Sequence, residues 1–181
     1  MDLFFVRHGQ TDDNLKNKVQ GRIDNPLNEI GKEQVLQTAI KLKELNVNFD
    51  MLCSSPLLRA RESAEIINNL LLIKNVKIMD DLTERAFGIL EGLDVFKVRE
   101  LVKIKDYKSE GYETDQEICK RVYNCVDEIR KHGEKILIVC HSHTIKAFLN
   151  CIDKNYDFVY PLKNAQIVHI VYNNGYTIKS I

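Results

Sequence analysis

Short, mainly apolar runs alternate along this chain with longer segments in which apolar residues recur every three or four positions. Runs of four or five mostly apolar residues predict strands that are buried on both faces. Apolar residues at helical spacing, with Lys and Glu between them, predict amphipathic helices. The runs that predict such strands lie at 3–6, 49–53 and 136–140, and the run at 76–79 predicts a further short strand. The helical patterns lie at 28–45, 55–71, 94–105, 114–132 and 142–150.

The end of the chain has a different pattern. Two apolar-rich runs at 167–172 and 176–179 flank Asn173-Asn174-Gly175, a combination that is typical of a β-hairpin. The preceding strands are separated by helices, which favours parallel pairing. We therefore expect an α/β fold, a three-layer sandwich in which helices flank a mostly parallel central sheet.

Three helix starts carry recognisable signals. Asn28 is a favourable cap, Thr114 with Glu117 forms a capping box, and Ser55 followed by Pro56 predicts a cap at Ser55. The spacing after Asn28 predicts an inward face made of Val35, Leu36, Ala39, Ile40 and Leu42.

Composition limits the function classes. The 181 residues suit one domain over positions 1–181, and 26 basic residues balance 26 acidic ones, so nothing favours a nucleic-acid partner. The N-terminal apolar run of four residues is too short for a signal peptide or a membrane span. Five cysteines without a Cys-x-x-Cys pair indicate reduced thiols and a cytoplasmic protein. The expected assembly is a monomer or a homodimer, and no pattern in the sequence chooses between them.

Cationic and titratable residues follow three of the predicted strands. Arg7 and His8 follow the first strand, Arg59 follows the second, and His141 follows the run at 136–140. Parallel strands present their carboxyl ends at the same sheet edge, where ligands bind. Arg59 also falls in the first turn of its helix, where a cation is unfavourable unless an anion is bound. The alternative for each of these residues is an ordinary exposed surface position.

An arginine beside a histidine suits a phosphoryl group. Guanidinium groups donate to phosphate oxygens, and a neutral imidazole is a nucleophile. His8 would attack through Nε2 if a nearby carbonyl held the proton on Nδ1. The neighbouring cations should depress the pKa of His8 and keep the ring neutral.

Five segments resemble the motifs of one known family, in the family's order. They are Arg7-His8-Gly9-Gln10-Thr11 with Asn14 and Gln20-Gly21-Arg22; residues 54–64 with Arg59; residues 82–92 with Glu84; residues 111–114 with Arg121; and Val139-Cys140-His141. Together they resemble the histidine phosphatase superfamily, the phosphoglycerate-mutase-like proteins.

The resemblance implies a phosphoglycerate-mutase-like fold and assigns roles to residues. His8 would be the phosphorylated nucleophile and Glu84 the proton donor, with Arg7, Arg59 and His141 completing the catalytic set. Asn14, Gln20, Gly21, Arg22 and Ser142 would bind the substrate. Glu84 lies between Leu82 and Phe87, an apolar setting that favours a protonated carboxyl.

The chain departs from the family pattern in two places. Ser142 stands where a glycine usually follows the second histidine, and Tyr112 stands where a second glycine is usual. The segment between Gly92 and Glu113 is too short for the large insertion of the mutases, so it should cover the pocket poorly. Its lysines Lys97, Lys103 and Lys105 suit a solvated surface, although a phosphate-rich substrate could also use them.

Three rival interpretations remain. His141 and His143 could chelate zinc, but no carboxylate cluster accompanies them. Cys140 could be a thiol nucleophile, although a core position suits it better. A phosphoprotein-binding module would need neither a nucleophile at His8 nor a proton donor at Glu84.

The sequence thus favours a metal-independent phosphatase that hydrolyses a small phosphorylated metabolite and needs no cofactor. The alternative is a phosphoglycerate mutase.

Overall fold

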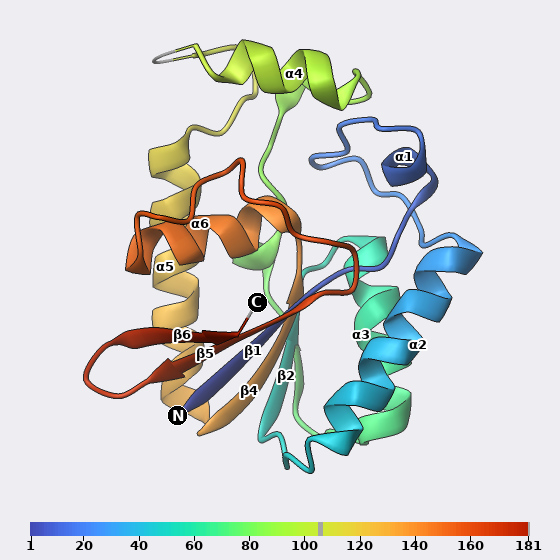
Figure 1. Cartoon of the computed structure of the whole chain (residues 1–181), viewed down its shortest axis with the longest axis vertical. Coiled ribbons are helices and arrows are strands. Elements are labelled where there is room, and N and C mark those ends of the chain that lie inside the picture. Colours follow the sequence, from blue (N-terminus) through green and yellow to red (C-terminus); the bar gives the residue numbers. More distant parts are fainter. Residues whose placement is uncertain (105–106, 181) are drawn as a thin grey trace.

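The central sheet of the computed structural model has six strands in the order β3-β2-β4-β1-β5-β6, and the structure describes residues 1–104 and 107–180 (Figure 1). Strands β1 to β4 pair in parallel, whereas β5 pairs antiparallel with β1, and β6 pairs antiparallel with β5. The strands are β1 (Asp2–Arg7), β2 (Met51–Ser54), β3 (Val76–Ile78), β4 (Lys135–Cys140), β5 (Ile167–Tyr172) and β6 (Tyr176–Ser180). This is the mostly parallel α/β architecture that the sequence predicts.

Helices cover both faces of the sheet. In Figure 1, α2 and α3 lie on one side of the sheet, and α5 and α6 lie on the other. The helices are α1 (Asp12–Leu15), α2 (Glu29–Glu44), α3 (Leu58–Leu71), α4 (Val95–Val102), α5 (Asp115–Ile129) and α6 (Ser142–Ile152), with short 3-10 turns at Asp80–Leu82, Gly88–Leu90 and Arg130–His132. Within the described ranges, no helix is both long and apolar enough to cross a bilayer.

Each face of the sheet carries its own core, which explains the apolar runs of the central strands. Side chains alternate between faces along a strand. Leu3 and Phe5 therefore pack into the core beneath α5 and α6, and Phe4 and Val6 pack into the core beneath α2 and α3.

Two of the three predicted helix caps are confirmed, and one is wrong. The side chain of Asn28 accepts from the Gly31 N–H, and Thr114 forms its capping box with Glu117. Helix α3, in contrast, begins at Leu58 and has no side-chain cap. Ser55 is instead held at the sheet edge, because its hydroxyl pairs with a ring nitrogen of His141 at 2.7 Å.

Two further details differ from the predicted pattern. On α2, Val35, Ala39 and Leu42 are buried, but Leu36 and Ile40 remain 41% and 38% exposed, because the face covered by the sheet is narrower than the apolar stripe. Helix α4 ends at Val102, and the predicted end at Lys105 lies outside the described residues.

Candidate active site

The carboxyl ends of β1, β2 and β4 meet at one edge of the sheet. Arg7 pairs with Cys140 in the parallel register of β1 and β4, and the His8 N–H donates to the Cys140 carbonyl at 3.0 Å. His141 follows β4 directly, and the His8 and His141 ring centroids lie 5.1 Å apart. The predicted convergence of the strand ends is confirmed.

His8 is held as a neutral ring with one free nitrogen. It is 2% exposed, and Nδ1 lies 2.7 Å from the Gly9 carbonyl, which can only accept a hydrogen bond. Nδ1 therefore carries the proton, and Nε2 keeps its lone pair. Burial, and next the positive charges of Arg59 and Arg7, lower the pKa of His8 well below its ordinary value.

Glycine at position 9 is required by close packing. A Cβ there would lie 2.3 Å from the Gly31 carbonyl oxygen at the start of α2. The Gly9 N–H donates to the Ser63 hydroxyl on α3 at 3.2 Å, and that hydroxyl donates to the Arg59 carbonyl at 2.7 Å. The turn that orients His8 is thus fixed by both α2 and α3.

Arg7 and Arg59 bring buried positive charge to His8. The Arg59 guanidinium donates to the carbonyls of Ile23 and Gly21 at 2.7 and 2.8 Å, and Arg7 donates to the Leu162 carbonyl at 2.5 Å. The Nε atoms of both arginines are buried without a hydrogen-bond partner. Burial lowers the pKa of Arg7 to about 10. Two buried guanidinium groups beside a neutral imidazole form a site for an anion.

His141 lies behind His8 and does not line the cavity. One ring nitrogen pairs with the Ser55 hydroxyl at 2.7 Å, and Nδ1 is buried without a partner. Burial and the charge of Arg59 lower the pKa of His141 well below its ordinary value. The site therefore holds two adjacent neutral imidazoles.

Glu84 follows the 3-10 turn at Asp80–Leu82 and enters the cavity from the far side of the sheet edge. Its Oε1 accepts from the backbone N–H groups of Arg85 at 2.9 Å and His143 at 3.0 Å. The Thr144 hydroxyl holds the Thr83 carbonyl at 2.8 Å, which ties this loop to α6. The carboxylate is thus oriented by the backbone.

These groups line a cavity of about 620 Å³, within the usual range for small-molecule sites. Four of the five predicted binding residues also line it: Asn14, Gln20, Gly21 and Ser142. Arg22 does not; its Nη2 lies 3.9 Å from a carboxylate oxygen of Glu113. Gly21 has φ +52°, and a Cβ there would clash with the Glu91 side chain, so glycine is needed at that turn.

Helix α4 forms one wall of this cavity, through Val95, Val98, Arg99, Val102 and Lys103. Figure 1 shows α4 lying beyond the carboxyl ends of the strands. The expectation that this segment would barely cover the pocket is therefore wrong. The lysine at position 103 belongs to the pocket wall, whereas Lys105 lies outside the described residues.

Three residues of the site were missed by the sequence analysis. Lys146 lies on α6 and Arg85 follows Glu84, and both line the cavity. Asn164 lies outside this lining, but its side chain donates to the His8 carbonyl at 3.2 Å. For Lys146 a signal existed, because it interrupts the apolar run Ile145 to Leu149 of a helix that the structure buries. Asn164 lies in an irregular segment that no pattern marks.

The zinc interpretation finds no support in the geometry. The His143 ring stacks on Phe158, with ring centroids 5.7 Å apart, and meets the Phe87 ring edge-on. Among the residues that the structure describes, no three His, Cys, Asp or Glu side chains are placed to share a metal ion. Cys140 is a core residue with no exposed surface.

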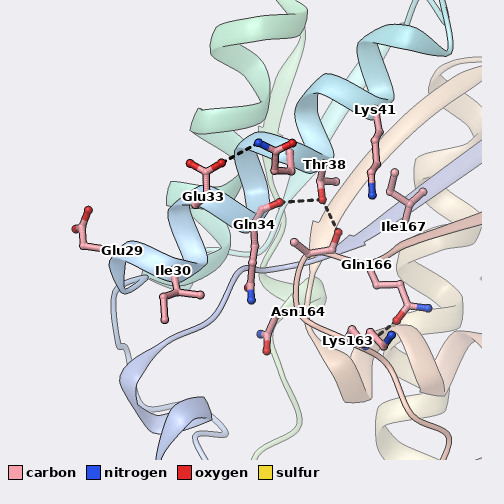
Figure 2. A pocket seen from close by; sticks show the side chains of 12 residues that line it. Glu29, Ile30, Glu33, Gln34, Thr38, Lys41, Lys163, Asn164, Gln166 and Ile167 are labelled. Atoms are coloured by element: carbon pink, nitrogen blue, oxygen red, sulfur yellow. Dashed lines mark hydrogen bonds between the residues drawn. The ribbon is translucent and has the colours of Figure 1, made fainter.

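A second hollow, of about 820 Å³, lies between α2 and residues 163–167 (Figure 2). At its edge the Thr38 hydroxyl bonds to the Ala165 carbonyl at 2.7 Å. The Ala165 N–H in turn donates to the His8 carbonyl at 3.1 Å. Residues 163–167 therefore line this hollow on one side and support the backbone of His8 on the other.

Residues 3–180 match the family model of the histidine phosphatase superfamily, branch 1. The chain belongs to this superfamily. It is 37% identical over 149 residues to the uncharacterized phosphatase PhoE of Bacillus subtilis, covering 80% of this chain and 73% of PhoE. It is 31% identical to a broad-specificity phosphatase of Saccharomyces cerevisiae, covering 81% of this chain and 68% of that one. The solved phosphoglycerate mutase of Bacillus anthracis superposes with a TM-score of 0.87 at 25% identity, covering all of this chain and 92% of the mutase.

This histidine phosphatase superfamily member therefore has the fold that its motifs imply. Its relatives include both phosphatases and phosphoglycerate mutases, so membership leaves the balance between the two activities open.

Proposed function

We propose that this protein is a metal-independent phosphatase that hydrolyses a small phosphorylated metabolite. The observation that carries the proposal is His8, because the Gly9 carbonyl holds Nδ1–H and leaves Nε2 free beside the guanidinium groups of Arg7 and Arg59, whose Nε atoms are buried. Nε2 attacks phosphorus, the P–O bond to the leaving group breaks, and a phosphohistidine forms. Water then attacks the phosphohistidine, which releases phosphate and restores His8.

The cationic groups act on the charge of the transferring phosphoryl group. Arg7 and Arg59, whose Nε atoms have no hydrogen-bond partner, donate to its oxygens. His141, held by Ser55, lies outside the cavity lining and supports the His8 ring, with the two ring centroids 5.1 Å apart. Asn14, Gln20, Gly21 and Ser142 line the remaining floor. Arg22 would join them only if its side chain turned from Glu113 toward the cavity.

Glu84 supplies the proton to the leaving oxygen. Its carboxyl is held in the cavity by the backbone N–H groups of Arg85 and His143, so it keeps a fixed position. In the second step the same group takes a proton from the attacking water. A binding module would need neither of these proton transfers.

Hydrolysis is favoured over mutase activity by two observations. The relatives reported at 37% and 31% identity are phosphatases by name, whereas the related phosphoglycerate mutase of Rhizobium etli is 30% identical. Arg99 on α4 and Lys103 just after it both line the cavity and remain exposed, so the cavity opens to solvent beside α4 and water has access to the phosphohistidine. The structural similarity to the Bacillus anthracis phosphoglycerate mutase supports the alternative, mutase activity.

The test compares the two activities in one preparation. With 3-phosphoglycerate as substrate, phosphate release should outpace formation of 2-phosphoglycerate. The opposite ratio, with activation by 2,3-bisphosphoglycerate, would favour the mutase.

Three wider features belong to the same proposal. Residues 1–181 act as one domain, supported by a sheet that joins strands from both ends of the chain. The five free cysteines fit the reducing cytoplasm. No nucleic-acid or membrane partner is expected, and the assembly is a monomer or a homodimer.

A further inference from the structure

The candidate active site holds more positive charge than one phosphoryl group needs. Eight residues that line the cavity are Lys or Arg and three are Asp or Glu, although the whole chain is electrically balanced. Two of the cations, Arg7 and Arg59, serve the phosphoryl group of the proposed function. A phosphoryl group also fills only a small part of a 620 Å³ cavity.

One further cation, Arg85, is already neutralised by its neighbours. Its guanidinium donates to Asp115 at 2.5 Å and to the Tyr112 hydroxyl at 2.7 Å, and it stacks 4.1 Å from the Phe158 ring centre. Arg85 therefore builds the cavity wall, and an additional ligand is not required to explain it.

Lys146 is in the opposite situation. It is 8% exposed, and its ammonium makes one hydrogen bond, to the Phe158 carbonyl at 3.1 Å. An ammonium group has three donors, so two remain for the cavity. Within the described ranges, no carboxylate lies within 4.0 Å of Lys146 Nζ.

The charges that face Lys146 come from every element packed around it. Arg7 on β1 and Arg99 on α4 are like charges that lower its pKa, and burial lowers it most, to about 8. Glu84 and Asp157 oppose this shift. On α6 itself, the titratable group closest in sequence is His143, whose ring is partly exposed and whose pKa is lowered by desolvation and by the charge of Arg85.

Neither facing carboxylate forms a direct ion pair with Lys146, and both are oriented by backbone donors. Glu84 accepts from two backbone N–H groups, and Asp157 Oδ1 accepts from the Val159 and Tyr160 N–H groups, each at 2.9 Å. A nearly buried lysine beside two arginines is costly unless an anion joins them.

We propose that the substrate carries a second anionic group, a carboxylate or a second phosphate, that binds Lys146 and Arg99 between α6 and α4. This outer anion site, defined by Lys146 and Arg99, rests on the proposed function, because it places the second charge on the molecule whose phosphoryl group meets His8. It selects against phosphate esters whose remaining part is uncharged.

The test uses two matched substrate pairs. 3-Phosphoglycerate and glycerol 3-phosphate differ by a carboxylate, and fructose 1,6-bisphosphate and fructose 6-phosphate differ by a second phosphate. A hydrogen-bonded ion pair should raise kcat/KM for the more charged member by about 10- to 100-fold. The pair with the larger ratio identifies the anion. Ratios near one for both pairs would overturn the proposal.

Variants assign the effect to Lys146. The Lys146→Met substitution should bring the favoured ratio to within about threefold of one, since the lost ion pair accounts for most of it. Lys146→Arg should retain the ratio, and Lys41→Met, an exposed lysine of α2, is the matched control. A ratio that is unchanged in Lys146→Met would refute the assignment.

Two further readouts separate this inference from the proposed function. In the wild type the ratio should fall as pH rises above about 8, where Lys146 loses its proton, and it should persist in Lys146→Arg. Ligand-induced thermal shifts with the same pairs report binding even if no phosphate is released. Absence of turnover with all substrates and p-nitrophenyl phosphate would remove the phosphatase proposal, whereas equal thermal shifts within each pair would remove the outer anion site.

Discussion

Replacing Glu84 by glutamine should separate proton donation from substrate binding. Glutamine has the same shape, and its carbonyl oxygen can still accept from the Arg85 and His143 N–H groups that hold Oε1. What disappears is the proton that the carboxyl delivers to the leaving oxygen.

The structural cost of this substitution is limited. Two backbone hydrogen bonds change from a carboxyl to an amide acceptor, which lowers the free energy of unfolding by at most about 2 kcal/mol. For a chain of this size that corresponds to a fall in Tm of at most about 8 °C. The variant is therefore folded at assay temperature, and its kinetics report chemistry.

The effect on turnover should depend on the leaving group. An alkoxide needs a proton, so kcat for glycerol 3-phosphate should fall by about 10²- to 10⁴-fold. Nitrophenolate is a stable anion, so the loss with p-nitrophenyl phosphate should be far smaller. Phosphate release is measured for both substrates, with Glu65→Gln, an exposed carboxylate on α3, as control. Equal losses on both substrates would refute the role of Glu84 as proton donor.

Three other predictions address stability and metal dependence. His8, His141 and His143 all have a pKa well below the ordinary value, so the unfolded chain binds more protons below pH 6.5. The stability contributed by the three neutral rings is thus fully present above about pH 6.5. As the pH falls below this value toward the pKa of a ring in the folded protein, that ring lowers the free energy of unfolding by roughly 1.4 kcal/mol per pH unit. A Tm that is constant from pH 7 to 5 would contradict this. Gly31→Ala would place a Cβ 2.0 Å from the Gln10 carbonyl oxygen in the turn after β1, so the free energy of unfolding measured with denaturant should fall by at least about 2 kcal/mol. Gly175→Ala, whose Cβ would meet no atom within 4 Å, should not lower it. Phosphatase activity should survive exhaustive chelation of metal ions. If chelation abolished the activity and added zinc restored it, His141 and His143 would instead be metal ligands.

Much of the fold could be predicted because each strand is marked locally. Leu3 to Val6 and Ile136 to Cys140 are buried on both faces, so their runs are continuous and their ends can be located within a residue. Strand ends then predict the meeting of Arg7, His8 and His141, since topology alone brings them to one edge.

What the sequence could not show depends on contacts between distant segments. Ser55 looks like a helix cap, but its hydroxyl is taken by His141, 86 positions away. Arg22 matches a binding motif, yet Glu113 lies near enough to hold its side chain outside the cavity lining. Lys146 interrupts an apolar run, which marks it as unusual, but only the packing of α4 and the segment around Phe158 places it in the cavity wall.

The central claim is that His8 carries the phosphoryl group, and the most direct test is to trap it. Brief incubation with phosphorylated substrate followed by denaturation should leave a phosphoenzyme that is labile in acid and stable in alkali. Peptide mapping should place the phosphate on His8, and His8→Ala should give neither the phosphoenzyme nor turnover. Full activity in His8→Ala, or a phosphate that is stable in acid, would contradict the account.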